Sequence, residues 1–115
     1  MMENNKAILE QANAAIVKGD YEGFLSHCTE DTEWVFVGER TLQGKEAVRQ
    51  YMAEVYLEPP VFMVEKLVAG EDHVTAIGKI NLKDDSGAAA SYTYCDVWRF
   101  QAGKMAGLQA FVIKD

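Results

Sequence analysis

Residues 92–105 constrain the fold of this chain more than any other stretch. Aromatic and β-branched residues dominate positions 92–100, and the sequence Gln-Ala-Gly-Lys-Met follows. This pattern predicts a long strand, a tight turn at Gly103 and a final strand that runs to about residue 113. Side chains alternate between the two faces of a strand, so one face receives Tyr92, Tyr94, Asp96, Trp98 and Phe100. That face is aromatic and carries a single carboxyl group.

The composition argues against several classes of partner. The chain has 115 residues, enough for one domain, and its 49% hydrophobic and 25% charged residues are ordinary for a globular protein. The net charge of −7 argues against nucleic acid, because binding to phosphates needs clustered Lys and Arg. No run of basic residues is present, so we also expect no binding to a membrane.

The two cysteines and the N-terminal residues predict a cytoplasmic protein. Cys28 and Cys95 are too few for a disulfide framework, and we expect two free thiols. The start of the sequence lacks the apolar segment of a secretory signal, and no apolar run reaches membrane-spanning length.

Apolar spacing predicts helices at about residues 3–18, 20–28 and 45–56. Asp20 suits the N-cap of the second helix, and Pro59-Pro60 would end the third. Residues 32–37, 61–69 and 73–82 have the composition of strands, with a loop at 38–40 and a polar turn at 83–87. Helices followed by consecutive strands indicate an α+β domain, in which the helices cover one face of a curved, mainly antiparallel sheet.

The outer face of this sheet is predicted to be apolar. It would carry Cys95, Val97, Phe111 and Ile113. A small domain rarely leaves such a face in water, so we expect a homodimer that forms through it.

Four sequence features, taken in order, resemble the nuclear transport factor 2-like superfamily, which includes ketosteroid isomerases and SnoaL-like polyketide cyclases. They are Gly19-Asp20, Gly44-Lys45-Glu46-Ala47, Asp96-Val97-Trp98-Arg99-Phe100 and Gly103-Lys104-Met105. The resemblance spans nearly the whole chain, and it implies that residues 1–115 are a single SnoaL-like domain. It also implies a cone, in which three helices are wrapped by a strongly curved sheet with an apolar pocket between them.

Matching to a ketosteroid isomerase leaves two of its three catalytic groups without an equivalent. That enzyme uses an Asp base, with an oxyanion hole made by a Tyr and a neutral Asp. The oxyanion Asp matches Asp96, but the base matches Phe36 and the Tyr falls near Ala12. The chain is therefore not expected to be a ketosteroid isomerase.

The same matching directs a set of mainly aromatic side chains into the pocket. We expect ligand binding by Trp34, Phe36, Tyr51, Tyr56, Tyr94, Trp98, Leu108 and Val112, with Ala110 beside them. Such a lining is typical of small-molecule cavities. Aromatic residues on a concave face are equally typical of an ordinary core, and the sequence leaves both interpretations open.

Asp96 is the candidate catalytic residue. It would be an acid of raised pKa that donates a hydrogen bond or moves a proton. In the alternative interpretation it accepts hydrogen bonds from Tyr hydroxyls, or pairs with Lys79 or Arg99, and only fixes the strands. A second titratable group in the pocket would come from Glu33, Glu65 or Lys79 if the strand register differs by one residue.

No other motif points to chemistry. His27 and His73 are predicted to be exposed, no ligand spacing suggests a metal, and no phosphate-binding loop or nucleophile elbow is present, so we expect no cofactor. Two functions remain. One is a non-catalytic module that binds a small apolar molecule or uses its open sheet face as an interaction surface. The other is a proton-transfer enzyme acting on a small carbonyl or aromatic compound through Asp96. A single titratable group favours the first, because proton relocation usually needs a base and an oxyanion stabiliser.

Overall fold

The computed structural model describes residues 2–56, 61–83 and 86–115, which form three helices and six strands. The helices are α1 (Met2–Val17), α2 (Tyr21–Leu25) and α3 (Lys45–Val55). The strands are β1 (Cys28–Phe36), β2 (Arg40–Gln43), β3 (Val61–Ala69), β4 (His73–Lys83), β5 (Ala89–Gln101) and β6 (Lys104–Lys114). The predicted α+β class is confirmed.

The six strands form one sheet in the order β2-β1-β6-β5-β4-β3. Strands β3 to β6 make an antiparallel meander, and β1 and β2 form a hairpin. The last strand joins these two halves, because β6 pairs parallel with β1. Positive φ angles at Ala102 and Gly103 make the tight turn between β5 and β6, as the sequence predicted.

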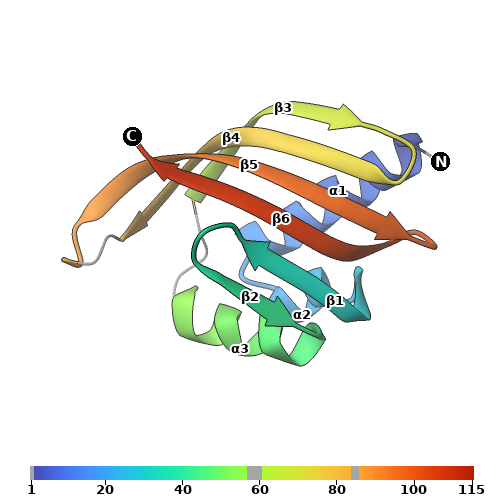
Figure 1. The fold of residues 1–115 in the computed structure, drawn as a ribbon, viewed down its shortest axis with the longest axis horizontal. Helices are drawn as coiled ribbons and strands as arrows, with labels where there is room; N and C mark the ends of the chain where they lie inside the picture. The colour runs from blue at the N-terminus through green and yellow to red at the C-terminus, as the bar shows by residue number, and fades with distance from the viewer. Residues whose placement is uncertain (1, 57–60, 84–85) are drawn as a thin grey trace.

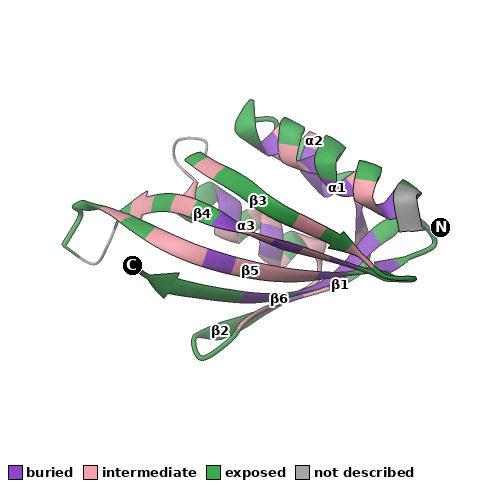
Figure 2. Ribbon diagram, turned by 90° about the horizontal axis from the view of Figure 1, so that it is seen from above, coloured by how far each residue is buried: buried purple, intermediate pink, exposed green. Residues whose placement is uncertain are grey.

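The helices lie on one side of the curved sheet. In Figure 1, α1 runs behind β4 to β6, and α3 lies beside the β1–β2 hairpin. Figure 2 shows α1 above β3 in the view turned by 90°. Helix α1 contacts β3, β4 and β6, whereas α3 contacts β1 and β2. The concave face is therefore covered, and the outer face carries no helix in the described part of the chain.

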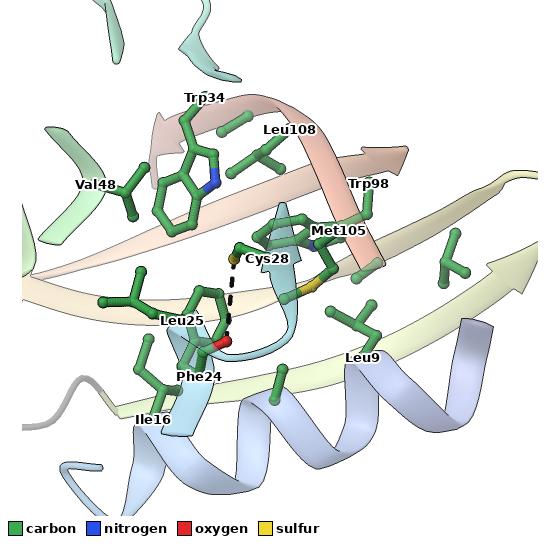
Figure 3. Close-up of a cluster of buried hydrophobic side chains, with 14 of the residues drawn as sticks. Leu9, Ile16, Phe24, Leu25, Cys28, Trp34, Val48, Trp98, Met105 and Leu108 are labelled. Atoms are coloured by element: carbon green, nitrogen blue, oxygen red, sulfur yellow. Dashed lines mark hydrogen bonds between the residues drawn. The ribbon is translucent and has the colours of Figure 1, made fainter. Parts of the chain in front are cut away.

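The centre of the core lies where α1 and α2 meet the middle of the sheet. Figure 3 shows this cluster, in which the labelled residues are Leu9, Ile16, Phe24, Leu25, Cys28, Trp34, Val48, Trp98, Met105 and Leu108. Leu9, Ala12 and Ile16 share one face of α1, since residues three and four apart lie on the same side of a helix.

Two local predictions are wrong. The second helix ends at Leu25, and Cys28 begins a strand, where it pairs with Met105 of β6. Residues 40–43, in part assigned to a loop, form β2 by pairing with β1. Both strands depend on partners distant in sequence or on a hairpin, which local composition does not reveal. The predicted helix stop at Pro59-Pro60 and positions 84–85 of the polar turn lie outside the described residues.

Candidate functional site

A cavity of about 110 Å³ lies between the helices and the concave face of the sheet. Every side chain that the sequence assigned to ligand binding lines it, together with the candidate acid: Trp34, Phe36, Tyr51, Tyr56, Tyr94, Asp96, Trp98, Leu108 and Val112. The structure thus brings the predicted site residues together. Their role in binding or catalysis stays a prediction.

The register of β5 and β6 positions the sheet side of the cavity. Tyr94 pairs with Val112, Asp96 with Ala110, and Trp98 with Leu108, as three successive rungs on one face. Because the side-chain period of a strand is two residues, the intervening residues point to the outer face. The small Ala110 stands opposite Asp96 and leaves space in front of its carboxyl group.

The cavity has a closed end and an exposed end. At the closed end Trp34 and Trp98 are only 3% and 5% exposed, and their rings meet edge to face at 5.5 Å between centroids. Phe24 packs against both of them. At the other end Val112 is 42% exposed. The lining thus runs from the buried indole rings to a partly exposed valine.

Helix α3 and the residue that caps it supply two phenol rings. Tyr51 stacks against Phe36 at 5.0 Å and meets Tyr56 at 5.9 Å between ring centroids. The hydroxyl of Tyr21 donates to the backbone oxygen of Tyr56 at 3.0 Å, which holds the end of α3 over the cavity. Burial raises the pKa of both Tyr51 and Tyr56, so both phenols stay neutral at physiological pH.

Asp96 is half-buried among these rings and has no hydrogen-bond partner within the described residues. The two cations that could have paired with it bond elsewhere: Lys79 donates to Thr93 and Asp115, and Arg99 donates to the backbone oxygen of Ala106. Burial raises the pKa of the Asp96 carboxyl to about 7, because no neighbouring cation offsets the loss of water. Asp96 is therefore paired with neither Lys79 nor Arg99 in the structure.

The register also locates the three groups that could have supplied a second titratable residue. Glu33 lies away from the cavity and accepts from Gln43, and Lys79 points to the outer face toward Thr93. Glu65 is exposed at a β-bulge in β3, and its charge contributes to the raised pKa of Tyr94. Asp96 is the one acidic or basic side chain among the described residues that line the cavity.

Sequence reasoning missed part of the lining. Those residues are Asn13, Ile16, Phe24, Phe62, Ile80 and Leu82. Asn13 lies four residues after the buried Leu9, so helical spacing was a signal that could have placed it inward. The other five are apolar residues of predicted helices and strands, and nothing local separates cavity wall from core.

One buried donor beside the cavity is also unpaired. The indole nitrogen of Trp34 has no hydrogen-bond partner in the described structure, and in Figure 3 it lies on the side of the ring toward Leu108. Among the described residues, no cluster of His, Cys, Asp and Glu could hold a metal ion. The site therefore offers aromatic faces, phenol hydroxyls, an indole N–H and one carboxyl group.

Comparison of the sequence with models of known protein families identifies the family of this chain. The model of the SnoaL-like domain matches residues 9–108. The chain belongs to the SnoaL-like domain family. This agrees with the nuclear transport factor 2-like resemblance of the sequence, and with the curved sheet and three helices described above.

Solved structures give the same fold at low sequence identity. Bal32a, from a soil-derived mobile gene cassette, aligns with a TM-score of 0.86 at 18% identity, covering 96% of this chain and 90% of its own. TerC, co-crystallised with polyporic acid, aligns with a TM-score of 0.79 at 20% identity, covering 97% and 92%. A nuclear transport factor 2-like protein from Burkholderia xenovorans LB400 has a TM-score of 0.75 at 24% identity, covering 97% and 91%.

No curated protein matches the sequence. Within the described residues of this SnoaL-like domain, no helix combines the length and the apolar character needed to cross a bilayer.

Proposed function

We propose that this SnoaL-like domain binds a small, largely apolar, ring-containing molecule in the cavity, with Asp96 as the main polar contact. The observation that carries the proposal is the unpartnered Asp96 carboxyl in an aromatic cavity that is exposed at one end. A carboxyl group placed only to hold strands together would have hydrogen-bond partners, because an unpaired buried polar group destabilises a protein. A ligand that contacts Asp96 removes that cost.

Two further features support this proposal. The lining is mainly apolar with few polar groups, which is the usual make-up of a small-molecule site. A protein of the same fold, TerC, was crystallised together with a small organic compound, polyporic acid. The fold alone does not assign a function, so the proposal depends on the site residues.

Tryptophan fluorescence tests the proposal directly, because Trp34 and Trp98 both line the cavity. We would titrate the protein with phenols, steroids and polyketide-like aromatic compounds, and repeat the titration with Asp96→Asn. The expected result is saturable quenching that weakens in Asp96→Asn and is unchanged in Asp31→Asn, a control at an exposed carboxylate. If no compound quenches a folded protein, the aromatic residues are core and the proposal fails.

Proton transfer is the second candidate function, and one observation favours it. A carboxyl group with a pKa of about 7 is half-protonated at neutral pH, where it can both accept and donate a proton. The substrate class would be a small carbonyl compound with an acidic C–H bond. Nuclear magnetic resonance in D₂O would detect exchange at the carbon beside the carbonyl of cyclic ketones, and Asp96→Asn should abolish it. If the wild-type protein exchanges no faster than the variant, the domain is a binder and not an enzyme.

We further propose a homodimer through the outer face of the sheet. Phe111 and Ile113 are 40% and 67% exposed. Cys95 of β5 pairs with Ile77 of β4 on one side and with Phe111 of β6 on the other, so the apolar surface continues across these three strands. Sedimentation analysis should give a dimer that dissociates in Phe111→Lys, while Val17→Lys, at an exposed valine of α1, stays dimeric. A monomeric wild-type protein would contradict the proposal.

A cytoplasmic location and the extent of the domain over residues 1–115 stay predictions from the sequence.

A further inference from the structure

We propose that the ligand of this cavity is an organic cation, with an apolar body and one positively charged nitrogen that sits among the aromatic rings beside Asp96. This inference rests on the proposed ligand-binding function and names the charge class of the ligand. It depends on the aromatic lining, on the sign of the charge in the cavity and on the absence of a competing partner for Asp96 among the described residues.

The cavity wall is rich in aromatic rings. Tyr51 and Tyr56 approach from α3 and its C-cap, and Trp34, Tyr94 and Trp98 approach from β1 and β5. Neighbouring rings pack at steep angles, 84° between the two indoles and 75° between Tyr51 and Tyr56. Aromatic faces attract ammonium groups through the negative side of the ring, and sites lined by several such rings bind quaternary ammonium ligands.

The cavity carries charge of one sign only. The described lining contains the Asp96 carboxyl and no Lys, Arg or His side chain. An anionic ligand would meet a carboxyl group with no cation to balance it, whereas a cationic ligand would supply the missing partner. One face of the Tyr51 ring already holds a cation, because the Arg40 guanidinium lies 4.8 Å from its centroid. The net charge of −7 also favours the approach of cations.

Binding of a cation should strengthen as pH rises through neutrality. A cation favours the ionised form of Asp96, whose pKa in the empty cavity is about 7, so binding near pH 7 releases a proton. The groups that face Asp96 are the phenols of Tyr51 and Tyr56 from the α3 side and that of Tyr94 on its own strand. All three pKa values are raised, that of Tyr94 to about 12, so these phenols do not titrate in this range. The charged neighbours of these phenols are Glu39 and Arg40 next to Tyr51, and Glu65 next to Tyr94.

An isosteric pair of probes isolates the charge. Phenyltrimethylammonium and tert-butylbenzene have the same shape, differ only in a positive nitrogen in place of a carbon, and carry no group that titrates. Titration of the wild-type protein at pH 8, followed by tryptophan fluorescence and calorimetry, should give about tenfold tighter binding of the cation, a typical gain from cation–π contacts and a counter-ion. The anion benzoate should bind more weakly than either.

The Asp96→Asn variant supplies the second measurement. The variant keeps the size of the side chain but removes its charge. The preference for the cation over the neutral isostere should therefore shrink severalfold, and cation binding should no longer depend on pH. Calorimetry at pH 7 in two buffers of different ionisation enthalpy should show proton release on cation binding by wild type only.

The outcomes separate the two proposals. If tert-butylbenzene binds as tightly as the cation to the wild-type protein, the inference of a cationic ligand is wrong and the ligand-binding function stands. If the cation is preferred equally by wild type and Asp96→Asn, the carboxyl group is not its counter-ion and the inference is also wrong. If neither probe binds, both proposals fail. The comparison within wild type needs no variant to fold.

Discussion

At the scale of single residues, the unpartnered Asp96 has a consequence for stability that needs no ligand. The folded protein holds the proton of this carboxyl up to a pKa of about 7, whereas the unfolded chain releases it near 3.8. Between these values the native state binds more protons than the unfolded state. The contribution of Asp96 therefore becomes less favourable as pH rises from about 4 to 7, and stays unfavourable above 7.

Asp96→Asn should therefore stabilise the empty protein at high pH. At pH 8 we expect the free energy of unfolding to exceed that of wild type by roughly 1 to 3 kcal/mol, because the variant buries a neutral amide in place of a carboxylate. The difference should become smaller toward pH 4. Urea denaturation followed by tryptophan fluorescence at several pH values checks this. A stabilisation that is independent of pH would show that charge burial is not its cause.

Cys28 carries a second prediction at this scale. Its thiol is fully buried, and burial raises its pKa to about 12, so the reactive thiolate is scarce. In a Cys95→Ala background, Cys28 should stay unreactive toward a thiol reagent in the native state and react at once in urea. Fast labelling of the native protein would show that the core around α2 opens readily. Cys28 acts as an apolar core residue.

At the scale of elements, Gly78 of β4 is the position where the sheet tolerates no side chain. A Cβ atom there would lie 1.9 Å from the backbone oxygen of Met63 and 3.0 Å from the Tyr94 hydroxyl. Strand β3 has a bulge just beyond this point, between Val64 and Lys66, and its backbone approaches β4 closely. The bulge also brings Glu65 near Tyr94.

Gly78→Ala should destabilise the protein by about 2 kcal/mol or more, because backbone atoms of β3 must move to make room. Gly70→Ala is the matched control, since a Cβ there would lie 3.6 Å from the nearest oxygen, an ordinary contact. Chemical denaturation of the two variants makes the comparison. Equal stability would mean that β3 shifts freely along the edge of the sheet.

The elements also show how far the sequence can be read. The bounds of β3 were predicted to the residue, and the long β5 with its turn at Gly103 was recognised because alternation and a glycine turn are local signals. The start of β1 at Cys28 was not predicted, because it depends on pairing with Met105, which is distant in sequence. The predicted lining residues all reached the cavity. Alternation fixes the face of Asp96 and Trp98, whereas the lining residues outside their strand were assigned by the resemblance to the superfamily. Asn13 was missed because a polar residue on a helix is usually assigned to the solvent side.

At the scale of the whole molecule, the sheet separates two surfaces. The covered concave face holds the cavity, and the outer face holds exposed apolar residues such as Phe111 and Ile113. A substitution on one face reaches the other only through the backbone. The proposed ligand and the proposed dimer should therefore respond to different residues.

Phe111→Lys should change assembly and leave ligand affinity within about twofold of wild type, because side chains on opposite faces of a strand are energetically independent to a first approximation. Leu108→Ala should weaken the binding of a phenol and leave assembly unchanged, so its sedimentation behaviour stays that of wild type. Measuring both properties for both variants provides the check. A loss of binding in Phe111→Lys would show that the dimer is needed to shape the cavity.

The pairing of β5 with β6 places Tyr94, Asp96 and Trp98 opposite Val112, Ala110 and Leu108 on a single face. These six positions form a compact block that can be randomised without touching the residues of the outer face. A library built on them, with Ala110 as the position that sets the depth of the space before Asp96, would explore new ligands while the assembly stays constant. If the domain binds the small molecule that we propose, the same separation would let natural selection exchange that molecule without changing the outer face.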